Sequence, residues 1–346
     1  MFSGCYTALI TPFTSDSGVD EAGLEKLIEF QASEGVSGVL AVGTTGESPT
    51  LNREEHNRVT ERVCALMKGQ GRAIAGTGSN STEETMRATE HAAHAGADTI
   101  LLVDPYYNGP SSLEIRREYV GPVAGAFPEL EMICYVIPGR TGTKLLPEDL
   151  AILHRDYQNV NTVKEATGDL ENMARTRECC GEDFNILSGD DDKTCAMMTD
   201  ARIRASGVIS VMSNVAPGAI QRFTRAINEG NMEAADGLAE AMKPLFGMVG
   251  VASEEETPFG KTEVKARNPL PIKTMMRILG MPAGPCRQPL GRMNPGGLEK
   301  VLDNARTVQH NHPEIFAPIE AFFKVDIAKR LEGRSVLEGL AYTDSG

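Results

Sequence analysis

The chain has 346 residues, 41% hydrophobic and 24% charged, which favours ordered cores over general disorder. Lys plus Arg number 34 and Asp plus Glu number 48, a net charge of −14, so the chain lacks the basic surface that binding nucleic-acid phosphates requires. We find no apolar run near the ~18 residues of a membrane span and no secretion signal. Seven cysteines without a CxxC pair fit reduced thiols, so we expect a cytoplasmic protein.

The first 230 residues alternate short β-branched runs with segments of helical periodicity, the pattern of βα units and a parallel sheet. Strands are predicted over 6–11, 38–43, 72–78, 99–103, 132–137, 161–166, 185–189 and 207–211. Helices are predicted over 20–34, 53–67, 82–95, 112–126, 147–154, 170–180, 191–200 and 216–229. Asp20, Asn52 and Ser81 stand at N-cap positions, and Pro147 opens a helix. This count predicts an α/β fold, a (β/α)8 TIM barrel over 1–230, with an open doubly wound sheet as the alternative.

The alternation ends after Gly230. Helical periodicity returns over 232–251, 269–281 and 298–308, with a polar stretch over 252–268 between the first two. We therefore expect a C-terminal helical domain over 231–311. Residues 312–346 contain an apolar patch and a polar end, and we treat them as a tail to which the sequence assigns no role.

One lysine stands inside a predicted strand. Alternation in the sixth strand places Lys164 on one face and Glu165 on the other, so these neighbours are poor partners. A lysine directed into a barrel interior must pair with a charge or lose its proton, because burial disfavours the ammonium form. The neutral amine can attack a carbonyl carbon and form a Schiff base. The ordinary alternative is a lysine at the strand's rim whose amine reaches water.

The loops after the predicted strands carry groups suited to a small anionic substrate. GTTGES (43–48) follows the second strand, and the amides and hydroxyls of such a tight turn can converge on a carboxylate. It lacks the P-loop lysine and the GxGxxG spacing, so a nucleotide is not the preferred ligand. Tyr106 and Tyr107 follow the fourth strand and Tyr135 lies in the fifth, where phenols beside an amine can relay protons. Arg140 could hold a second carboxylate.

These segments together resemble the dihydrodipicolinate synthase and N-acetylneuraminate lyase family of lysine-dependent aldolases. The resemblance covers about residues 4–305 and rests on GTTGES, PYYN, YVIPGRTG, VKEATGD, LSGDD and GVISV. Arg140 in GRTG favours the synthase branch over the sialic-acid lyase branch. The resemblance implies condensation of pyruvate with L-aspartate 4-semialdehyde to 4-hydroxy-tetrahydrodipicolinate, a step of lysine and diaminopimelate biosynthesis, without a metal or an organic cofactor.

The same resemblance implies the catalytic roles. Lys164 would form an imine with the keto group of pyruvate. Tyr135 would donate and accept protons, with Thr44 and Tyr107 extending the relay. Tyr107 would reach into the neighbouring site of a tight dimer, and two such dimers would form a homotetramer.

Binding roles follow from the resemblance in the same way. The Thr44–Thr45 turn would hold the pyruvate carboxylate, Arg140 would hold the carboxylate of the semialdehyde, and Gly189 and Ile209 would line the pocket. Feedback lysine is a further candidate ligand, although Arg53 places positive charge where that cation would bind. The positions that match lysine-binding positions of sensitive members are Ser48, His56, Asn80, Glu84 and Tyr106.

Two alternative functions stay open. One is another pyruvate-dependent aldolase or lyase of the same scaffold, acting on N-acetylneuraminate or 4-hydroxy-2-oxoglutarate. The other is a pyruvate-binding regulator without catalysis. Val136 and Gly139 depart from residues common in the family, and these departures leave the chemistry expected at Lys164 intact. The acidic run Asp190–Asp192 is interpreted as capping a helix start rather than binding a metal, because no His or Cys stands nearby at ligand spacing.

Overall fold

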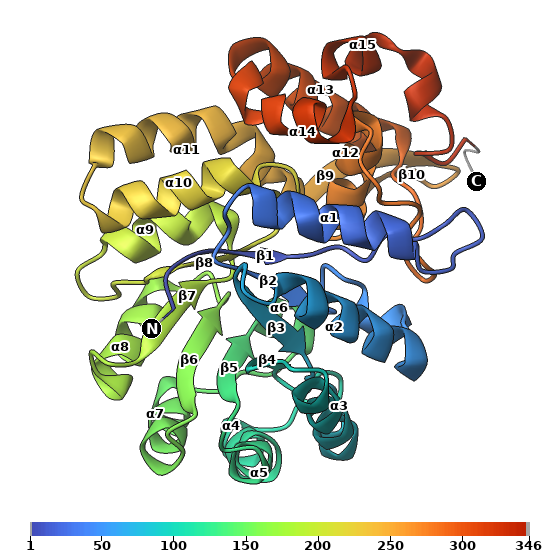
Figure 1. Ribbon diagram of the computed structural model, residues 1–346. Coiled ribbons are helices and arrows are strands. Elements are labelled where there is room, and N and C mark those ends of the chain that lie inside the picture. Colours follow the sequence, from blue (N-terminus) through green and yellow to red (C-terminus); the bar gives the residue numbers. More distant parts are fainter. Residues whose placement is uncertain (1, 344–346) are drawn as a thin grey trace.

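Eight parallel strands close into a barrel in the computed structural model, which describes residues 2–343 (Figure 1). Each strand pairs with the next along the chain, and β1 closes the ring by pairing with β8, with Tyr6 opposite Ile209. The strands are β1 (Gly4–Ala8), β2 (Gly38–Ala41), β3 (Arg72–Gly76), β4 (Thr99–Val103), β5 (Glu131–Val136), β6 (Val160–Glu165), β7 (Asn185–Ser188) and β8 (Gly207–Ser210). This confirms the predicted barrel and rules out the open sheet.

Helices surround the barrel and follow the predicted order. They are α1 (Glu21–Ser33), α2 (Arg53–Met67), α3 (Thr82–His94), α4 (Ser112–Glu114), α5 (Gly121–Ala126), α6 (Pro138–Thr141), α7 (Pro147–Asp156), α8 (Leu170–Cys180), α9 (Thr194–Thr199) and α10 (Pro217–Asn228). A π-helical stretch over Ile115–Val120 joins α4 to α5, so this region matches the helix predicted over 112–126. Asp20 accepts a hydrogen bond from the Gly23 amide, and Asn52 forms a capping box with Glu55, as their positions predicted.

Two apolar layers separate the inside of the barrel from the space between strands and helices. Tyr6, Leu40, Ile133, Leu187 and Ile209 belong to the interior layer, and the large outer layer joins the opposite strand faces to the helices. Such a separation follows from strand alternation, because successive side chains point to opposite faces. The interior is therefore a filled core, and a polar group inside it needs a specific partner.

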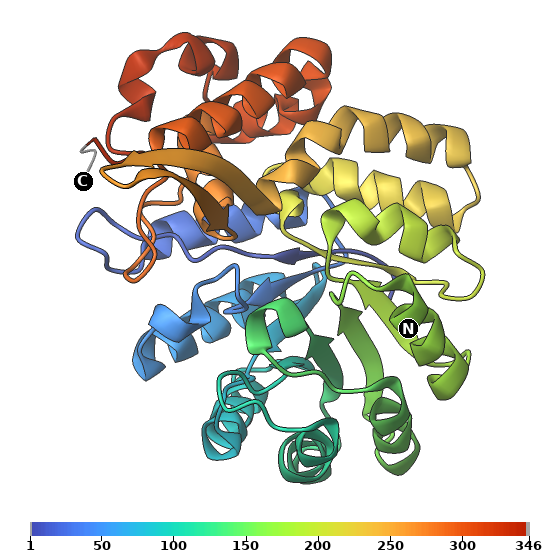
Figure 2. The same ribbon diagram turned by 180° about the vertical axis from the view of Figure 1, so that it is seen from behind.

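The chain after α10 packs against one side of the barrel, beside α1 and α10 in both views (Figure 1 and Figure 2). Its elements are α11 (Met232–Phe246), β9 (Gly250–Thr257), β10 (Gly260–Arg267), α12 (Leu270–Leu279), α13 (Pro295–Asn311), α14 (Ala317–Phe323) and α15 (Ile327–Glu332). The helices predicted after residue 231 are present as α11, α12 and α13. The stretch 252–268, predicted only as polar, is an antiparallel hairpin with Val264 opposite Ser253. Its outward residues are charged on both strands, so hydrophobic alternation gave no strand signal.

Residues 312–343 pack against the rest of the protein. Phe316, Ile319 and Ile327 are buried in the outer apolar layer. Phe322 and Phe323 lie with ring centroids 5.3 and 5.2 Å from the ring of Phe30 in α1. This segment therefore stabilises the contact between α1 and the C-terminal helices. Within residues 2–343, no helix combines the length and the apolar composition that crossing a membrane requires.

Candidate active site

Lys164 lies inside the barrel, on β6, as strand alternation predicted. It is 4% exposed, and its Nζ lies 4.2 Å from the ring centroid of Tyr135, the residue opposite it on β5. Glu165 points to the other face, where its carboxylate accepts hydrogen bonds from the Thr167 amide and from Asn172 Nδ2. The rim-exposed alternative is therefore wrong, and the amine faces an enclosed site.

Burial changes the acid–base behaviour of this lysine. The pKa of Lys164 falls from 10.5 to about 8. Removal of the amine from water is the largest cause, whereas the carboxylates of Asp190 and Asp191 raise the pKa. Arg140 lowers it further by charge repulsion. Burial also raises the pKa of the Tyr135 phenol, with Arg140 acting in the opposite direction, so the phenol stays protonated at neutral pH. The site thus pairs an amine that can lose its proton with a phenol that holds one.

An inner cavity of about 40 Å³ reaches the lysine, and a larger one of about 240 Å³ opens beside it. Both are lined by Gly43, Thr44, Tyr135, Ile137 and Arg140. The inner cavity also touches Lys164, Thr45 and Gly189. Most of the sequence-predicted substrate groups are therefore brought together at one place, beyond the carboxyl ends of the barrel strands, where such folds place their active sites.

The threonine turn after β2 is held from outside the barrel. Thr45 is 3% exposed, and its Oγ1 accepts a hydrogen bond of 2.9 Å from Asn268 Nδ2. Arg140, on the short helix α6, donates from Nη2 to the main-chain oxygen of Asn268 at 3.0 Å. Asn268 follows β10 directly, so the base of the hairpin forms one wall of the cavity beside Val249.

Of the two residues predicted to line the pocket, Gly189 lines the inner cavity and Ile209 does not. Gly189 follows β7, and a Cβ there would lie 2.8 Å from Ala166 Cβ and 3.2 Å from Lys164 Cε, so only glycine leaves room for the lysine stem. Ile209 is fully buried in the barrel interior, but it lines neither of these two cavities. Val211, two residues further along, takes the lining position.

Tyr107 stands apart from the cavities within this single chain. It is 90% exposed and has a left-handed backbone with φ of 82°. Its neighbour Tyr106 lines the larger cavity together with Ser48. The chain alone therefore does not bring the Tyr107 phenol to Lys164, and the predicted relay through it requires a second chain.

The five positions predicted for an effector have different surroundings in the single chain. Ser48 and Tyr106 line the larger cavity. His56 is buried with Nε2 3.2 Å from the Gly76 oxygen, and burial lowers its pKa to about 4, so it is neutral. Glu84 accepts a hydrogen bond from Ser79 Oγ and lies 3.8 Å from Arg53 Nη2, while Asn80 is exposed beside it. Arg53 thus lies beside the carboxylate that an ammonium group would use.

Sequence reasoning did not place Asp190, Asp191 or Asn268 at the site. The acidic run does not cap the helix start with its side chains, which corrects the prediction. Asp191 is 3% exposed and instead accepts hydrogen bonds from the amides of Val211 and Met212 after β8. Asp190 lines the inner cavity, and burial raises its pKa to about 6. Two adjacent acids after a strand were the available signal, but local spacing could not assign them to the lysine.

A metal site would need several ligating side chains close together in the part of the chain that the structure describes. No group of three or more His, Cys, Asp or Glu side chains there is placed to hold a metal ion. What the cavity offers is a nucleophilic amine, a phenol, a threonine turn and an arginine. This set can capture a small keto acid covalently and move protons beside it.

Comparisons with known proteins agree with this geometry. The sequence profile of the dihydrodipicolinate synthetase family matches residues 1–307. The chain belongs to this family. It is 39% identical over 306 residues to the 4-hydroxy-tetrahydrodipicolinate synthase of Methanothrix thermoacetophila, covering 88% of this chain and 96% of that relative.

Solved structures of family members superpose on most of the chain. One is the chloride-inhibited dihydrodipicolinate synthase from Acinetobacter baumannii complexed with pyruvate, with a TM-score of 0.80 and 31% identity over 89% of this chain and 99% of that one. Another is the enzyme from Cyanidioschyzon merolae with lysine bound, with a TM-score of 0.80 and 34% identity over 89% and 98%. The family's barrel therefore extends over the candidate site.

Proposed function

We propose that this chain is a lyase that condenses pyruvate with L-aspartate 4-semialdehyde to 4-hydroxy-tetrahydrodipicolinate, in lysine and diaminopimelate biosynthesis. Relatives that match this chain over almost their full length bear the name 4-hydroxy-tetrahydrodipicolinate synthase. The observation that carries the proposal is the buried amine of Lys164, 4.2 Å from the Tyr135 ring, in a cavity that also holds the threonine turn and Arg140.

The first half of the reaction uses Lys164. Its neutral amine attacks the keto carbon of pyruvate, and the resulting carbinolamine loses water to give a protonated imine. Thr44 and Thr45 hold the pyruvate carboxylate. The imine nitrogen accepts the electron pair of a methyl C–H bond as its proton leaves, which gives an enamine. Tyr135 and Thr44 carry protons in these steps, because their hydroxyls line the same cavity as the amine.

The second half forms the new carbon–carbon bond. The enamine carbon attacks the aldehyde carbon of the semialdehyde, whose carboxylate pairs with Arg140, and the new alkoxide takes up a proton. The substrate's own amine then adds to the imine carbon and closes the ring. The bond to Lys164 breaks at that step, and the free amine is regenerated.

The test is mass spectrometry of the protein treated with pyruvate and borohydride. A covalent adduct should map to Lys164 and disappear in Lys164→Ala. Absence of an adduct in the unaltered protein would contradict imine chemistry and leave the non-catalytic regulator. A panel of aldehydes with pyruvate separates the remaining alternative: turnover of N-acetylmannosamine or glyoxylate without turnover of aspartate semialdehyde would favour another aldolase of the same scaffold.

The assembly and the location of the protein are part of the proposal. We propose a dimer in which the exposed Tyr107 completes the proton relay of the partner's site, and a tetramer of two dimers. Support comes from the 90% exposure of Tyr107 and from its absence among the residues that line the cavity of its own chain. Seven free cysteines support a cytoplasmic location. The elements over 231–311 are proposed to act as a C-terminal domain that supports the mouth of the barrel.

Lysine is proposed as a feedback inhibitor that binds at Ser48, His56, Asn80, Glu84 and Tyr106. A lysine-bound relative supports the proposal, whereas the Arg53–Glu84 pair weakens it. Initial rates measured with increasing lysine decide the question, and unchanged rates at millimolar lysine would reject it. Arg53→Gln should strengthen inhibition, because it frees the Glu84 carboxylate for an ammonium group.

A further inference from the structure

A buried ion pair lies directly behind the threonine turn. Lys273 Nζ is 2.7 Å from Glu47 Oε1, and the two side chains are 2% and 0% exposed. Glu47 comes two residues after Thr45, whereas Lys273 belongs to α12, outside the barrel and 226 positions further along the chain. The pair therefore connects the C-terminal region to the loop that faces Lys164.

Both charges have further hydrogen-bond partners. Lys273 Nζ donates to the main-chain oxygens of Thr11 and Pro285 at 3.0 and 2.8 Å. The second carboxylate oxygen of Glu47 accepts from the Arg287 amide at 2.9 Å. Burial of two charges is costly unless their remaining hydrogen-bond groups are matched, and here they are. The carboxylate thus has one orientation, fixed by two separate segments of the C-terminal region.

This orientation matters because Glu47 has an unfavourable backbone conformation. Its φ is 56°, in the left-handed region that residues with a side chain rarely adopt. The Glu47 amide donates to the Thr44 oxygen at 3.1 Å, and Thr11 Oγ1 donates to the Gly46 oxygen at 2.7 Å. Strained turns persist when surrounding contacts over-determine them. The carboxylate of Glu47 supplies those contacts, and the turn that it fixes carries Thr44 and Thr45.

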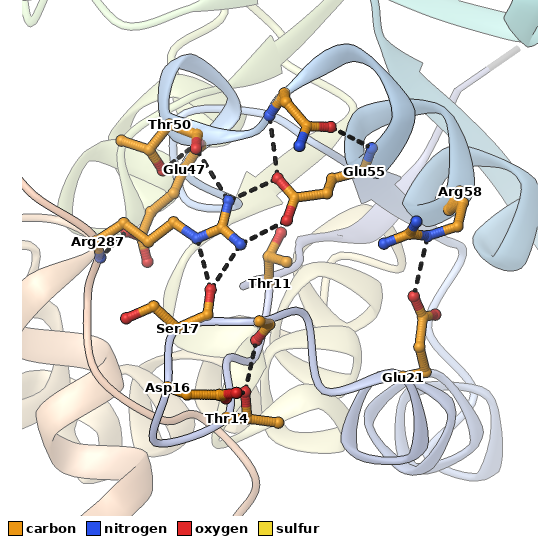
Figure 3. A network of polar contacts seen from close by, with 12 residues as sticks. Thr11, Thr14, Asp16, Ser17, Glu21, Glu47, Thr50, Glu55, Arg58 and Arg287 are labelled. Atoms are coloured by element: carbon orange, nitrogen blue, oxygen red, sulfur yellow. Dashed lines mark hydrogen bonds and ion pairs between the residues drawn. The ribbon is translucent and has the colours of Figure 1, made fainter.

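Arg287 supports the same loop from the outside. Figure 3 shows its guanidinium between the loop that holds Ser17 and the segment from Glu47 to Glu55. It donates to the Ser17 oxygen at 2.6 Å, to the Thr50 oxygen at 3.0 Å and to both carboxylate oxygens of Glu55 at 2.6 Å. The start of α2 and the end of the turn are therefore held by one side chain.

We infer that Glu47 and Lys273 are positioning residues for the pyruvate carboxylate: the pair holds the Thr44–Thr45 turn in the geometry that receives it. This inference rests on the proposed function for the identity of the ligand. Neither residue lines the inner cavity around Lys164, so both act through the turn. A purely structural role predicts loss of stability alone, whereas a positioning role predicts weaker pyruvate binding in a protein that remains folded.

Three variants separate the two roles: Glu47→Gln, Lys273→Met and the double variant Glu47→Gln/Lys273→Met. Lys273→Met leaves a buried carboxylate without its cation and should lower the melting temperature most. The double variant removes both charges and should regain much of that temperature. In Glu47→Gln and in the double variant, the KM for pyruvate should rise about tenfold with kcat changed less than about threefold. Amide hydrogen exchange over residues 43–50 should be faster in both.

The control is Arg72→Met, which breaks an ion pair with Glu131 at the amino-terminal ends of β3 and β5, the opposite end of the barrel. It should lower the melting temperature and leave pyruvate KM within about twofold of the unaltered protein. A folded Glu47→Gln or double variant with unchanged exchange over 43–50 and unchanged pyruvate KM would overturn the inference. If the unaltered protein forms no imine with pyruvate, the proposed function fails, and the exchange rates over residues 43–50 then test only whether the ion pair holds the turn.

Discussion

The burial of Lys164 predicts a distinctive pH dependence for its reaction with pyruvate. Imine formation needs the neutral amine, and burial lowers the pKa of this lysine from 10.5 to about 8. At pH 7 about one tenth of the molecules then carry the neutral form, against about three in ten thousand for a lysine in water. The enclosed position therefore increases the reactive fraction roughly 300-fold.

The rate of imine formation should consequently rise about tenfold from pH 6 to pH 7, continue to rise toward pH 8 and level off above about pH 9. The assay mixes the protein with limiting pyruvate at each pH, transfers timed samples into borohydride at one fixed pH and counts the adduct by intact mass. The fixed quench separates imine formation from the pH dependence of the reduction. A rate that keeps rising tenfold per unit up to pH 10 would show that Lys164 behaves as a solvated amine, and the reasoning from burial would be refuted.

Three further predictions concern charges near the site. Asp190→Asn removes a carboxylate that raises the pKa of Lys164, so the imine-formation profile should move to lower pH; an unmoved profile in the same assay would contradict this. Asp104 is buried, and burial raises its pKa to about 7, so its ionisation opposes folding. The melting temperature of Asp104→Asn minus that of the unaltered protein should therefore increase from pH 4 to pH 7 and stay constant above pH 7. A difference that does not change with pH would argue against this effect. Hydrogen bonds from Arg287 lower the pKa of Glu55 from its ordinary value of 4.5. These bonds therefore stabilise the folded protein fully above pH 4.5, and this stabilisation is lost as the pH falls further. Arg287→Met should cost about 2 kcal/mol in urea unfolding at pH 7 and less at pH 4, whereas an equal cost at both would count against this pair.

Local sequence patterns were sufficient to predict the barrel and the inward direction of Lys164. The alternation of β-branched runs with helical segments predicted eight strands and eight helices, because each βα unit carries its own periodicity and cap signals. Alternation within one strand was enough to direct Lys164 inward and Glu165 outward. The cavity around Lys164 also contains Thr44, Tyr135 and Arg140, all from loops or strands that the pattern had already placed at the carboxyl ends of the barrel.

Contacts between segments far apart in the sequence could not be predicted from local patterns. Asn268 reaches Thr45 across 223 positions, and Asp191 reaches the amides after β8 rather than the helix start next to it. Both partnerships depend on how the C-terminal region and the ends of β7 and β8 meet in space. The hairpin over 250–267 was missed for a different reason, since its strands bury only Val251 and Ser253 and carry no apolar face that a pattern could reveal.

The walls of the cavity have a consequence for the order in which the protein is made. A nascent chain that has emerged from the ribosome only as far as α10 already contains Lys164, Tyr135, Arg140 and both threonines. It still lacks Val249 and Asn268, which close the inner cavity, and Lys273, which fixes the turn through Glu47. The barrel strands are thus complete well before the pocket is. Translation of residues 249–273 is therefore the step that completes the proposed pyruvate pocket, so shorter chains would carry Lys164 in an incomplete site.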